Sequence, residues 1–294
     1  MKVFNQADMA ALSCSAFIDN TQPLVPLGIE PVDKAVGGLY PGACGILGIA
    51  NGGGKSSMIL ASALDNSVRV GVVSTEDTPD VWGVRMLAHI SGVDSLLIRK
   101  GDLTTAQRRA IAGAREALQG EFRFKTCFPL GSTITGVVEA VRALSEEGCS
   151  LVWLDYIQKV RGSNMDRRNE VAQTYTLFQG ACAQYGVAGM AASQLRRVGV
   201  DDDGFQRKPR REDLKESGDL ENEARLILLG EKDYRDPSIL KLWIEKSTVG
   251  GEGLVFFYKR DKSGTLRYLS EKGNHGKEEP RQGQKTREGD SSPF

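Results

Sequence analysis

The chain has 294 residues, 40% of them hydrophobic and 26% charged, a composition that excludes a disordered, collagen-like or membrane-embedded protein. Lysine plus arginine and aspartate plus glutamate number 38 each, so the net charge is zero and any nucleic-acid contact must come from a local basic patch. The five cysteines are widely spaced without a CxxC pair, which argues against a disulfide framework or a zinc site and fits a reducing cytosol. No signal peptide and no apolar run near the roughly 18 residues of a membrane helix are found, so we expect a cytoplasmic protein with no membrane partner.

Short apolar segments rich in valine, isoleucine, leucine and glycine predict β-strands, and they cover residues 44–49, 68–74, 122–127, 150–156, 187–193, 224–230, 239–246 and 253–260. The first six lack polar alternation, which is typical of strands buried on both faces, and helical segments separate the first five. This pattern predicts an α/β fold with a mainly parallel sheet flanked by helices. The last two strands lie on either side of "STVGGEG" and predict a C-terminal β-hairpin or an antiparallel edge extension.

Helix signals and composition divide the chain into three parts. Thr78 and Pro79 are a typical N-cap and first helical residue, and further helices are predicted over 132–147 and 170–185. Residues 1–27 form an N-terminal segment with a predicted helix from Gln6 to Phe17, and residues 28–271 form the main domain. Residues 272–294 are rich in charge, glycine and proline, which predicts a disordered tail that is either solvated or binds a partner through Phe294.

The strongest motif is a glycine-rich loop between an apolar strand and an apolar helix, and its candidate anion-binding residues are Asn51, Gly52, Gly53, Gly54, Lys55, Ser56 and Ser57. Residues without a Cβ let successive backbone N–H groups converge on a phosphate at a helix N-terminus. Lys55 would then reach the β- and γ-phosphates and Ser56 would ligate Mg²⁺. The match to GxxxxGK[ST] is imperfect, because the first glycine is expected at Ile49 and the nearest one is Gly48. The alternative is a flexible glycine-rich turn beside a surface lysine.

Polar side chains end three of the predicted strands. Asp155 ends "LVWLDY", where a carboxylate can reach a metal directly or through water. Glu76 follows "VGVVST" and is a candidate base or orienter for an attacking water, with the adjacent Asp77 as the alternative. Gln194 ends "GMAASQ", where an amide can sense the γ-phosphate, unless it is simply a helix cap or loop residue.

Taken in order, the segments "ILGIANGGGKSS", "VVSTEDTPDVWGVRMLA", "LVWLDYIQKV", "AASQLRRV", "REDLKESGDLENEARLILL" and "IEKSTVGGEG" resemble the C-terminal ATPase domain of the DnaB-like replicative helicases. The resemblance spans Gly28 to Arg267, and its most specific pieces are "DYIQ", "SQLRR" and "DLKESGDLENEA". It implies a RecA-like P-loop NTPase core that binds ATP and Mg²⁺. It also implies a homo-oligomeric ring, usually a hexamer, with ATP between subunits and single-stranded DNA in the channel.

The resemblance also assigns roles to the candidate residues. It makes Glu76 the catalytic carboxylate, Asp155 the metal-associated one together with Ser56, and Gln194 the γ-phosphate sensor beside Lys55. The helicases of this family carry an N-terminal helical domain that binds primase, whereas here only about 27 residues precede Gly28. The predicted helix in that segment is either a linker helix that docks on the next subunit or merely an extra helix.

The final nucleotide motif departs from the family pattern. The family has Lys-x-Arg there, whose arginine reaches the neighbour's γ-phosphate, whereas this chain has Lys246, Ser247 and Thr248. Lys246 stays a candidate ATP-binding residue, but such an arginine is worth about 10³ to 10⁵ in turnover. Its absence predicts slow hydrolysis, or a substitute such as Arg260, Arg267 or Lys246 itself. A lysine is the poorer bidentate partner for phosphate.

Two basic clusters are candidate DNA contacts. One follows the strand that ends in Gln194 and contains Arg196, Arg197, Arg207, Lys208, Arg210 and Arg211; the other follows the strand that ends in Asp155 and contains Arg161, Arg167 and Arg168. Basic side chains there would follow phosphates without reading bases, as a translocating motor requires. The alternative for either cluster is a solvated loop, and the acidic residues 201–203 would repel DNA or tune its release.

These observations predict an ATP-dependent, ring-forming motor on single-stranded DNA. The competing interpretation is an ATP-binding helicase-like adaptor or loader that hydrolyses little and acts through other replication proteins. A recombination or regulatory ATPase with a RecA-like fold fits "DYIQ" and "SQLRR" less well.

Overall fold

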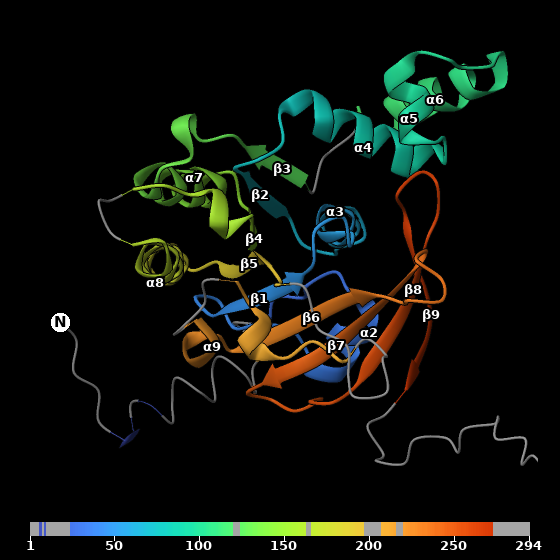
Figure 1. Ribbon diagram of the computed structural model, residues 1–294. Helices are drawn as coiled ribbons and strands as arrows, with labels where there is room; N and C mark the ends of the chain where they lie inside the picture. Colours follow the sequence, from blue (N-terminus) through green and yellow to red (C-terminus); the bar gives the residue numbers. More distant parts are fainter. Residues whose placement is uncertain are drawn as a thin grey trace, which may run out of the picture.

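The computed structural model describes residues 6, 7, 9, 24–119, 124–162, 166–196, 207–215 and 220–272. These residues build a nine-stranded sheet in the order β3-β2-β4-β5-β1-β6-β7-β8-β9 (Figure 1). The strands are β1 (Cys44–Ile49), β2 (Val70–Ser74), β3 (Phe124–Cys127), β4 (Leu151–Asp155), β5 (Ala188–Gln194), β6 (Leu226–Lys232), β7 (Ile239–Ser247), β8 (Val255–Arg260) and β9 (Leu266–Lys272). The first six strands pair in parallel, and β7, β8 and β9 extend the sheet by antiparallel pairing.

The predicted α/β fold is confirmed, and all eight predicted strands are present with small differences at their ends. The C-terminal hairpin is also present, but it continues into a third strand, β9, that the apolar runs do not predict. The reason is its position at the edge of the sheet, where Arg267 to Glu271 are exposed and carry few apolar side chains.

Helices cover both faces of the sheet. They are α2 (Glu30–Val36), α3 (Lys55–Leu64), α4 (Pro79–Ser91), α5 (Ser95–Lys100), α6 (Thr105–Ala117), α7 (Ile134–Glu146), α8 (Arg167–Tyr185) and α9 (Leu220–Glu223). Helices α7 and α8 lie on one face and α2 and α3 on the other (Figure 1). Helix α4 packs on the α3 side through Trp82 and reaches the turn between β8 and β9, where His89 Nδ1 lies 3.3 Å from Thr265 Oγ1. Local signals set several of these ends. Asp166 caps α8 through its side chain, and Thr104 and Gln107 form a capping box at α6.

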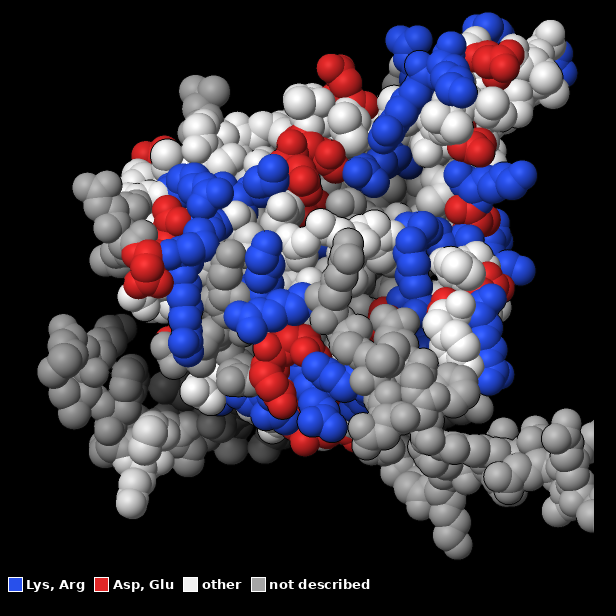
Figure 2. All heavy atoms as spheres, viewed as in Figure 1, with Lys and Arg blue, Asp and Glu red and all other residues white. Residues whose placement is uncertain are grey.

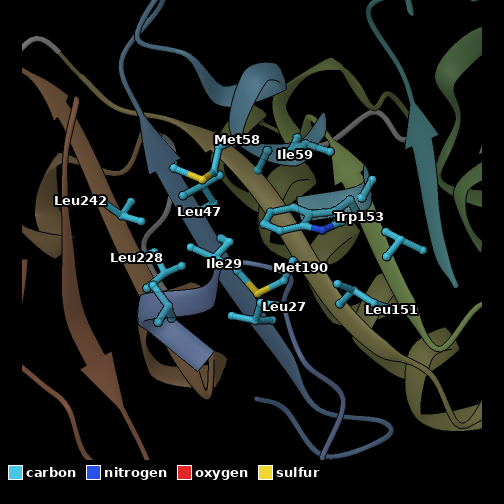
Figure 3. Packing of buried hydrophobic residues seen from close by; sticks show 14 of the residues in the cluster. Leu27, Ile29, Leu47, Met58, Ile59, Leu151, Trp153, Met190, Leu228 and Leu242 are labelled. Carbon is cyan, nitrogen blue, oxygen red and sulfur yellow. The ribbon is translucent and has the colours of Figure 1, made fainter. Parts of the chain in front are cut away.

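The two faces carry separate hydrophobic layers because successive strand residues point to opposite sides. Trp153 packs with Leu47 and Met58 beneath α3 (Figure 3), whereas its neighbours Val152 and Leu154 pack on the α7 and α8 side. Both layers exclude solvent, which is why the strands appear in the sequence as continuous apolar runs.

A buried hydrogen-bonded chain anchors the start of the described domain. The Trp153 indole donates to Ser62 Oγ at 2.9 Å, and the Ser62 hydroxyl in turn donates to the carbonyl of Leu27. Val25 and Leu27 are themselves buried in the same layer. The segment that enters the domain is therefore part of its core from Val25 onward.

Parts of the expected organisation fall outside the described residues. Apart from residues 6, 7 and 9, the predicted helix from Gln6 to Phe17 lies there, as do residues 273–294 of the predicted tail. The boundaries 1–27, 28–271 and 272–294 therefore stay predictions. Among the described helices, none combines the length and the apolarity needed to cross a membrane.

Candidate nucleotide-binding site

Residues 50–54 connect β1 to α3 at the carboxyl end of the central strand, between β5 and β6. Gly52 and Gly54 have φ angles of 67° and 108°, which side chains with a Cβ rarely adopt. A Cβ on Gly53 would lie 2.4 Å from Ile49 Cγ2, so the loop has no room for one. The three glycines therefore let the backbone wrap tightly at the N-terminus of α3, where unpaired N–H groups favour an anion.

Lys55 begins α3 and turns back toward the loop. Its side chain is 9% exposed, and Nζ donates to the carbonyl of Ile49 at 3.2 Å and lies 5.4 Å from the ring centre of Tyr156. Burial lowers the pKa of Lys55, against the opposing charges of Asp155 and Glu76. Because its hydrogen-bond acceptor is a neutral carbonyl, an anionic phosphate would be a stronger partner for this ammonium group.

Asp155 and Ser56 meet beside Lys55. Ser56 Oγ donates to Asp155 Oδ2 at 3.0 Å, and Asp155 is 2% exposed. Burial raises the pKa of Asp155 to about 6, and the Ser56 hydrogen bond and the Lys55 charge limit that rise. Asp155 Oδ1 is buried and has no hydrogen-bond partner among the described residues. A hydroxyl beside a carboxylate with an unsatisfied oxygen is the hard-oxygen donor set that Mg²⁺ prefers, so these two residues fit that ion.

The two candidate carboxylates after β2 have different surroundings. Asp77 forms a 2.7 Å ion pair with Arg85 and thereby braces α4. Glu76 is 47% exposed, and its Oε1 lies 3.8 Å from Lys159 Nζ. Glu76 is therefore the carboxylate that stays accessible next to Lys55, whereas Asp77 is engaged within the fold.

Gln194 ends β5 directly beside the phosphate loop, because its register partner in β1 is Ile49. Its backbone N–H donates to Gln158 Oε1 at 3.1 Å. Gln158 is buried and was not among the predicted site residues. The segment "DYIQ" that contains it is specific to the resemblance, but no local pattern in the sequence indicates a contact for the glutamine.

The C-terminal strands bring two further cations to the loop. Arg260 Nη1, from the end of β8, donates to the carbonyl of Gly52 at 3.3 Å. Lys232 Nζ, from the end of β6, lies 4.0 Å from the point where a Cβ of Gly52 would stand. Burial and the nearby Arg260 charge lower the pKa of Lys232. Arg267, the other candidate substitute, is 74% exposed on β9, and its nearest carboxylate oxygen belongs to Asp261 at 3.8 Å.

Lys246 lies at the other end of the sheet. It pairs in register with Ile227, which pairs with Ile46 in β1, and its Nζ donates to the carbonyl of Asn222 at 3.1 Å. Within one chain it is therefore not brought to the phosphate loop. Thr248 lies just beyond it, where its N–H donates to the carbonyl of Arg225. Any contact of Lys246 with a nucleotide would have to be made in another subunit's site.

The candidate loop residues Asn51 and Ser57 flank the anion-binding core. Asn51 is exposed at the start of the loop. Ser57 Oγ lies 3.7 Å from the point where a Cβ of Gly264 would stand, in the turn between β8 and β9. Ser56 is thus the hydroxyl that faces Asp155.

The candidate DNA-binding residues fall into three groups. Arg207 donates to both carboxylate oxygens of the buried Asp213, at 2.8 and 2.5 Å, and Arg167 pairs with Glu170 and with backbone carbonyls. The next group contacts carboxylates while remaining partly or fully exposed: Lys208 and Arg211 lie near Glu245, and Arg161 lies 3.6 Å from Glu170. Arg168, Arg196 and Arg210 are exposed, and Arg197 lies outside the described residues.

The charged surface has the same mixed character. Figure 2 shows lysine and arginine side chains interleaved with acidic ones rather than merged into one continuous basic face. Because Arg167 and Arg207 are held by buried carboxylates, they stabilise the fold locally. The exposed arginines are the side chains of this set that remain able to approach a phosphate backbone.

Comparison with known proteins places this site in a family context. Residues 25–260 match the family model described as DnaB-like helicase C terminal domain. The replicative DNA helicase DnaB of Haemophilus influenzae is 29% identical over 229 residues, which cover 73% of this chain and 48% of that protein. A probable plasmid replicative DNA helicase of Chlamydia trachomatis is 24% identical over 240 residues, covering 77% of this chain and 52% of that protein. The chain thus spans about half the length of these relatives.

Solved structures agree on the fold. One solved ATPase domain superposes with a TM-score of 0.79 at 21% identity, covering 91% of this chain and 100% of that chain. A DnaB-like replicative helicase, solved in a study of its interactions with primase, gives a TM-score of 0.76 at 19% identity, covering 92% of this chain and 68% of that chain. The predicted RecA-like ATPase fold is thereby confirmed.

The buried Asp155 carboxylate gives a stability prediction. Its pKa is raised by burial, so the folded state favours the protonated form, and the stability it provides falls as the pH rises from about 4 through about 6. At pH 7.5 in EDTA, Asp155→Asn should therefore raise the free energy of unfolding by about 1 to 3 kcal/mol, measured by urea denaturation. Magnesium with nucleotide should stabilise the wild type more than the variant, which keeps the loop and Lys55 but lacks one metal-binding carboxylate.

Asp80→Asn is the matched control, because Asp80 is exposed in the first turn of α4 and the change should stay within about 0.5 kcal/mol. An Asp155→Asn variant less stable than the wild type in EDTA at pH 7.5 would contradict a destabilising buried charge.

Proposed function

The chain belongs to the family of the DnaB-like helicase C-terminal domain, and we propose that it is an ATP-hydrolysing motor that moves along single-stranded DNA as a ring. The observation that carries the proposal is the cluster of Lys55, Ser56 and Asp155 at the glycine loop, with one carboxylate oxygen left unsatisfied. A structural loop would gain nothing from a desolvated acid and a desolvated base placed side by side. A triphosphate would bring negative charge to the Lys55 ammonium, and its metal ion would bring positive charge to the Asp155 carboxylate.

The residues of this chain divide the chemistry among them. The loop N–H groups and Lys55 bind and orient the β- and γ-phosphates. Ser56 and Asp155 would hold Mg²⁺, which would supply positive charge beside the phosphates. Glu76 orients the attacking water from its accessible position, and Gln194 registers whether the γ-phosphate is present.

The position of Lys246, away from the phosphate loop of its own chain, supports hydrolysis between subunits. Lys246 is in register with Ile227 and, through it, with Ile46 rather than with Ile49 beside the loop, so we assign it to a neighbour's nucleotide. A site completed in this way requires a head-to-tail interface, and such contacts form a ring when the rotation between subunits closes. We propose that they close as a hexamer. We place this ring in the cytoplasm, with single-stranded DNA in its channel and other replication proteins as further partners.

The missing arginine motivates a second candidate function. Thr248 replaces the family's arginine, so the chain could bind ATP with little hydrolysis and act as an adaptor or loader for a replication partner. Arg260 argues for turnover instead. It already lies against the loop at Gly52, in the same chain, and offers a planar guanidinium to the phosphates.

Steady-state ATP hydrolysis with and without single-stranded DNA separates the two candidates. Lys55→Ala should abolish nucleotide binding, while Glu76→Gln should retain binding and lower kcat by about 10² to 10⁴. Glu146→Gln, on the exposed face of α7, is the matched control and should hydrolyse ATP as the wild type does. Mass measurement with nucleotide should show a ring. Tight ATP binding with negligible turnover in either condition would sink the motor and favour the adaptor.

Arg260 and Arg267 are both candidates to replace the missing arginine, and substituting each in turn compares them. Removing a charge-assisted contact to phosphate is worth about 1.5 to 3 kcal/mol, so Arg260→Ala should lower kcat/KM for ATP by about 10- to 100-fold. Arg267→Ala should change it by less than about 2-fold, because that side chain is exposed on the outer strand. Equal effects of the two substitutions in steady-state kinetics would remove Arg260 from the nucleotide site.

The basic side chains give a separate test of DNA binding. The double variant Arg196→Ala, Arg210→Ala should weaken single-stranded DNA binding and flatten the salt dependence by about 0.7 per lost phosphate contact. Arg207→Ala should instead lower the free energy of unfolding by about 1 to 3 kcal/mol, since it removes the charged partner of the buried Asp213 and leaves, among the described residues, only the hydrogen bond from the Arg210 N–H. Titrations by fluorescence anisotropy at several salt concentrations, with urea denaturation alongside, measure both. An unchanged salt slope for the double variant would exclude these arginines from DNA contact.

A further inference from the structure

Gln158 joins three segments that are far apart in the sequence. It lies in the short 3₁₀ helix Ile157–Lys159 that follows Asp155, and it is 8% exposed. Its Nε2 donates to Ser193 Oγ at 2.8 Å and to the carbonyl of Lys215 at 2.9 Å, while its Oε1 accepts from the N–H of Gln194. The side-chain amide thus has both donor hydrogens and its acceptor engaged.

The segments that Gln158 holds are also paired to each other. Leu195 and Leu214 form an antiparallel bridge, flanked by hydrogen bonds from Lys215 N–H to the Gln194 carbonyl at 2.9 Å and from Arg196 N–H to the Asp213 carbonyl at 2.7 Å. The end of β5 and residues 213–215 are therefore held together by this isolated bridge and its two flanking hydrogen bonds, and we call this pairing the stem. The basic segment 207–215 is the described arm that leaves this stem.

We propose that Gln158 is a positioning residue that couples Gln194 to the basic segment 207–215. The inference rests on the proposed function, because it takes Gln194 as the group that responds to the γ-phosphate. A shift of Gln194 moves the backbone N–H that donates to Gln158 Oε1. The side-chain amide of Gln158 also donates through Nε2 to the carbonyl of Lys215. The stem therefore moves as a unit, and the basic side chains move with it.

The basic segment also has contacts of its own with Asp213 and with β7. Arg207 is clamped to Asp213, so the two ends of the segment travel together. Lys208 and Arg211 contact Glu245 on β7, across the sheet from the stem. Gln158 also lies only three residues after Asp155, so the element that carries the metal-associated carboxylate carries the coupling amide too.

Substitution of Gln158 by glutamate distinguishes its contact with Gln194 from its contact with Lys215. A carboxylate still accepts from the N–H of Gln194, but it faces the carbonyl of Lys215 with an oxygen in place of a donor. Gln158→Glu should therefore keep the contact to the sensor and break the contact to the basic arm. Gln158→Met removes both contacts at similar volume and is the second variant should the buried charge prevent folding. Gln107→Glu, in the exposed capping box of α6, is the matched control.

Hydrogen exchange measured by mass spectrometry, with and without a non-hydrolysable ATP analogue and Mg²⁺, tests the coupling. In the wild type and in Gln107→Glu, nucleotide should slow exchange in peptides covering residues 50–56 and change it in those covering 194–196 and 207–215. In Gln158→Glu the response at 50–56 should persist while the response at 207–215 is lost. In Gln158→Met the response at 207–215 should likewise be lost. The ratio of DNA-stimulated to basal turnover should fall in parallel, with KM for ATP unchanged.

The outcomes distinguish this inference from the function on which it rests. A nucleotide response at 207–215 that survives in both Gln158 variants overturns the coupling role and leaves the nucleotide site intact. A wild type whose loop responds while 207–215 does not overturns it equally. A wild type with no response at 50–56 removes the nucleotide site itself, and the inference falls with it.

Discussion

The buried carboxylate of Asp155 is the constraint on which the rest of this site depends. Strand β4 is buried on both faces, so its last residue enters a desolvated environment at the sheet edge. A charge there is costly unless something opposite in sign or strongly hydrogen-bonding lies next to it. The chain supplies the Ser56 hydroxyl and the partly desolvated Lys55, and still leaves one carboxylate oxygen unsatisfied among the described residues. The negative charge of Asp155 is thus only partly compensated by the described residues around it.

Sheet topology explains why the remaining side chains gather there. Strands β2, β4, β5 and β1 are consecutive in the sheet and parallel, so their carboxyl ends meet at one edge. Glu76, Asp155, Gln194 and Lys55 come from these ends or from the segments just after them. The same edge is where β6 and β8 end, which places Lys232 and Arg260 against the loop. A single edge therefore collects groups from six strands.

The sequence predicted the parts of this arrangement that are local. Continuous apolar runs marked the buried strands, and three successive glycines before Lys55 marked the loop, because each signal depends on neighbours in the chain. The contact of Arg260 with Gly52 and the role of Gln158 depend on pairing across the sheet, so no local pattern contains them. For Arg207 and Arg167 the sequence shows the charge that predicts DNA contacts, whereas their carboxylate partners are visible only in the folded chain. Their contacts with DNA stay a prediction.

On the proposed function, the replacement of the family's Lys-x-Arg arginine by Thr248 would change how far hydrolysis depends on assembly. An arginine supplied by a neighbour makes hydrolysis conditional on assembly, since the isolated subunit lacks it. Arg260 belongs to the chain that owns the loop, so the positive charge it supplies is present before any ring forms. On the proposed function, the neighbour would contribute only Lys246, a point charge that cannot make the paired contact of a guanidinium. On the proposed function, charge neutralisation would therefore depend more on the subunit and less on its neighbour than in relatives that retain the arginine. On the same proposal, assembly would act chiefly by closing the site and aligning DNA-binding segments, and Gln158 would couple the two through its contacts with Gln194 and Lys215.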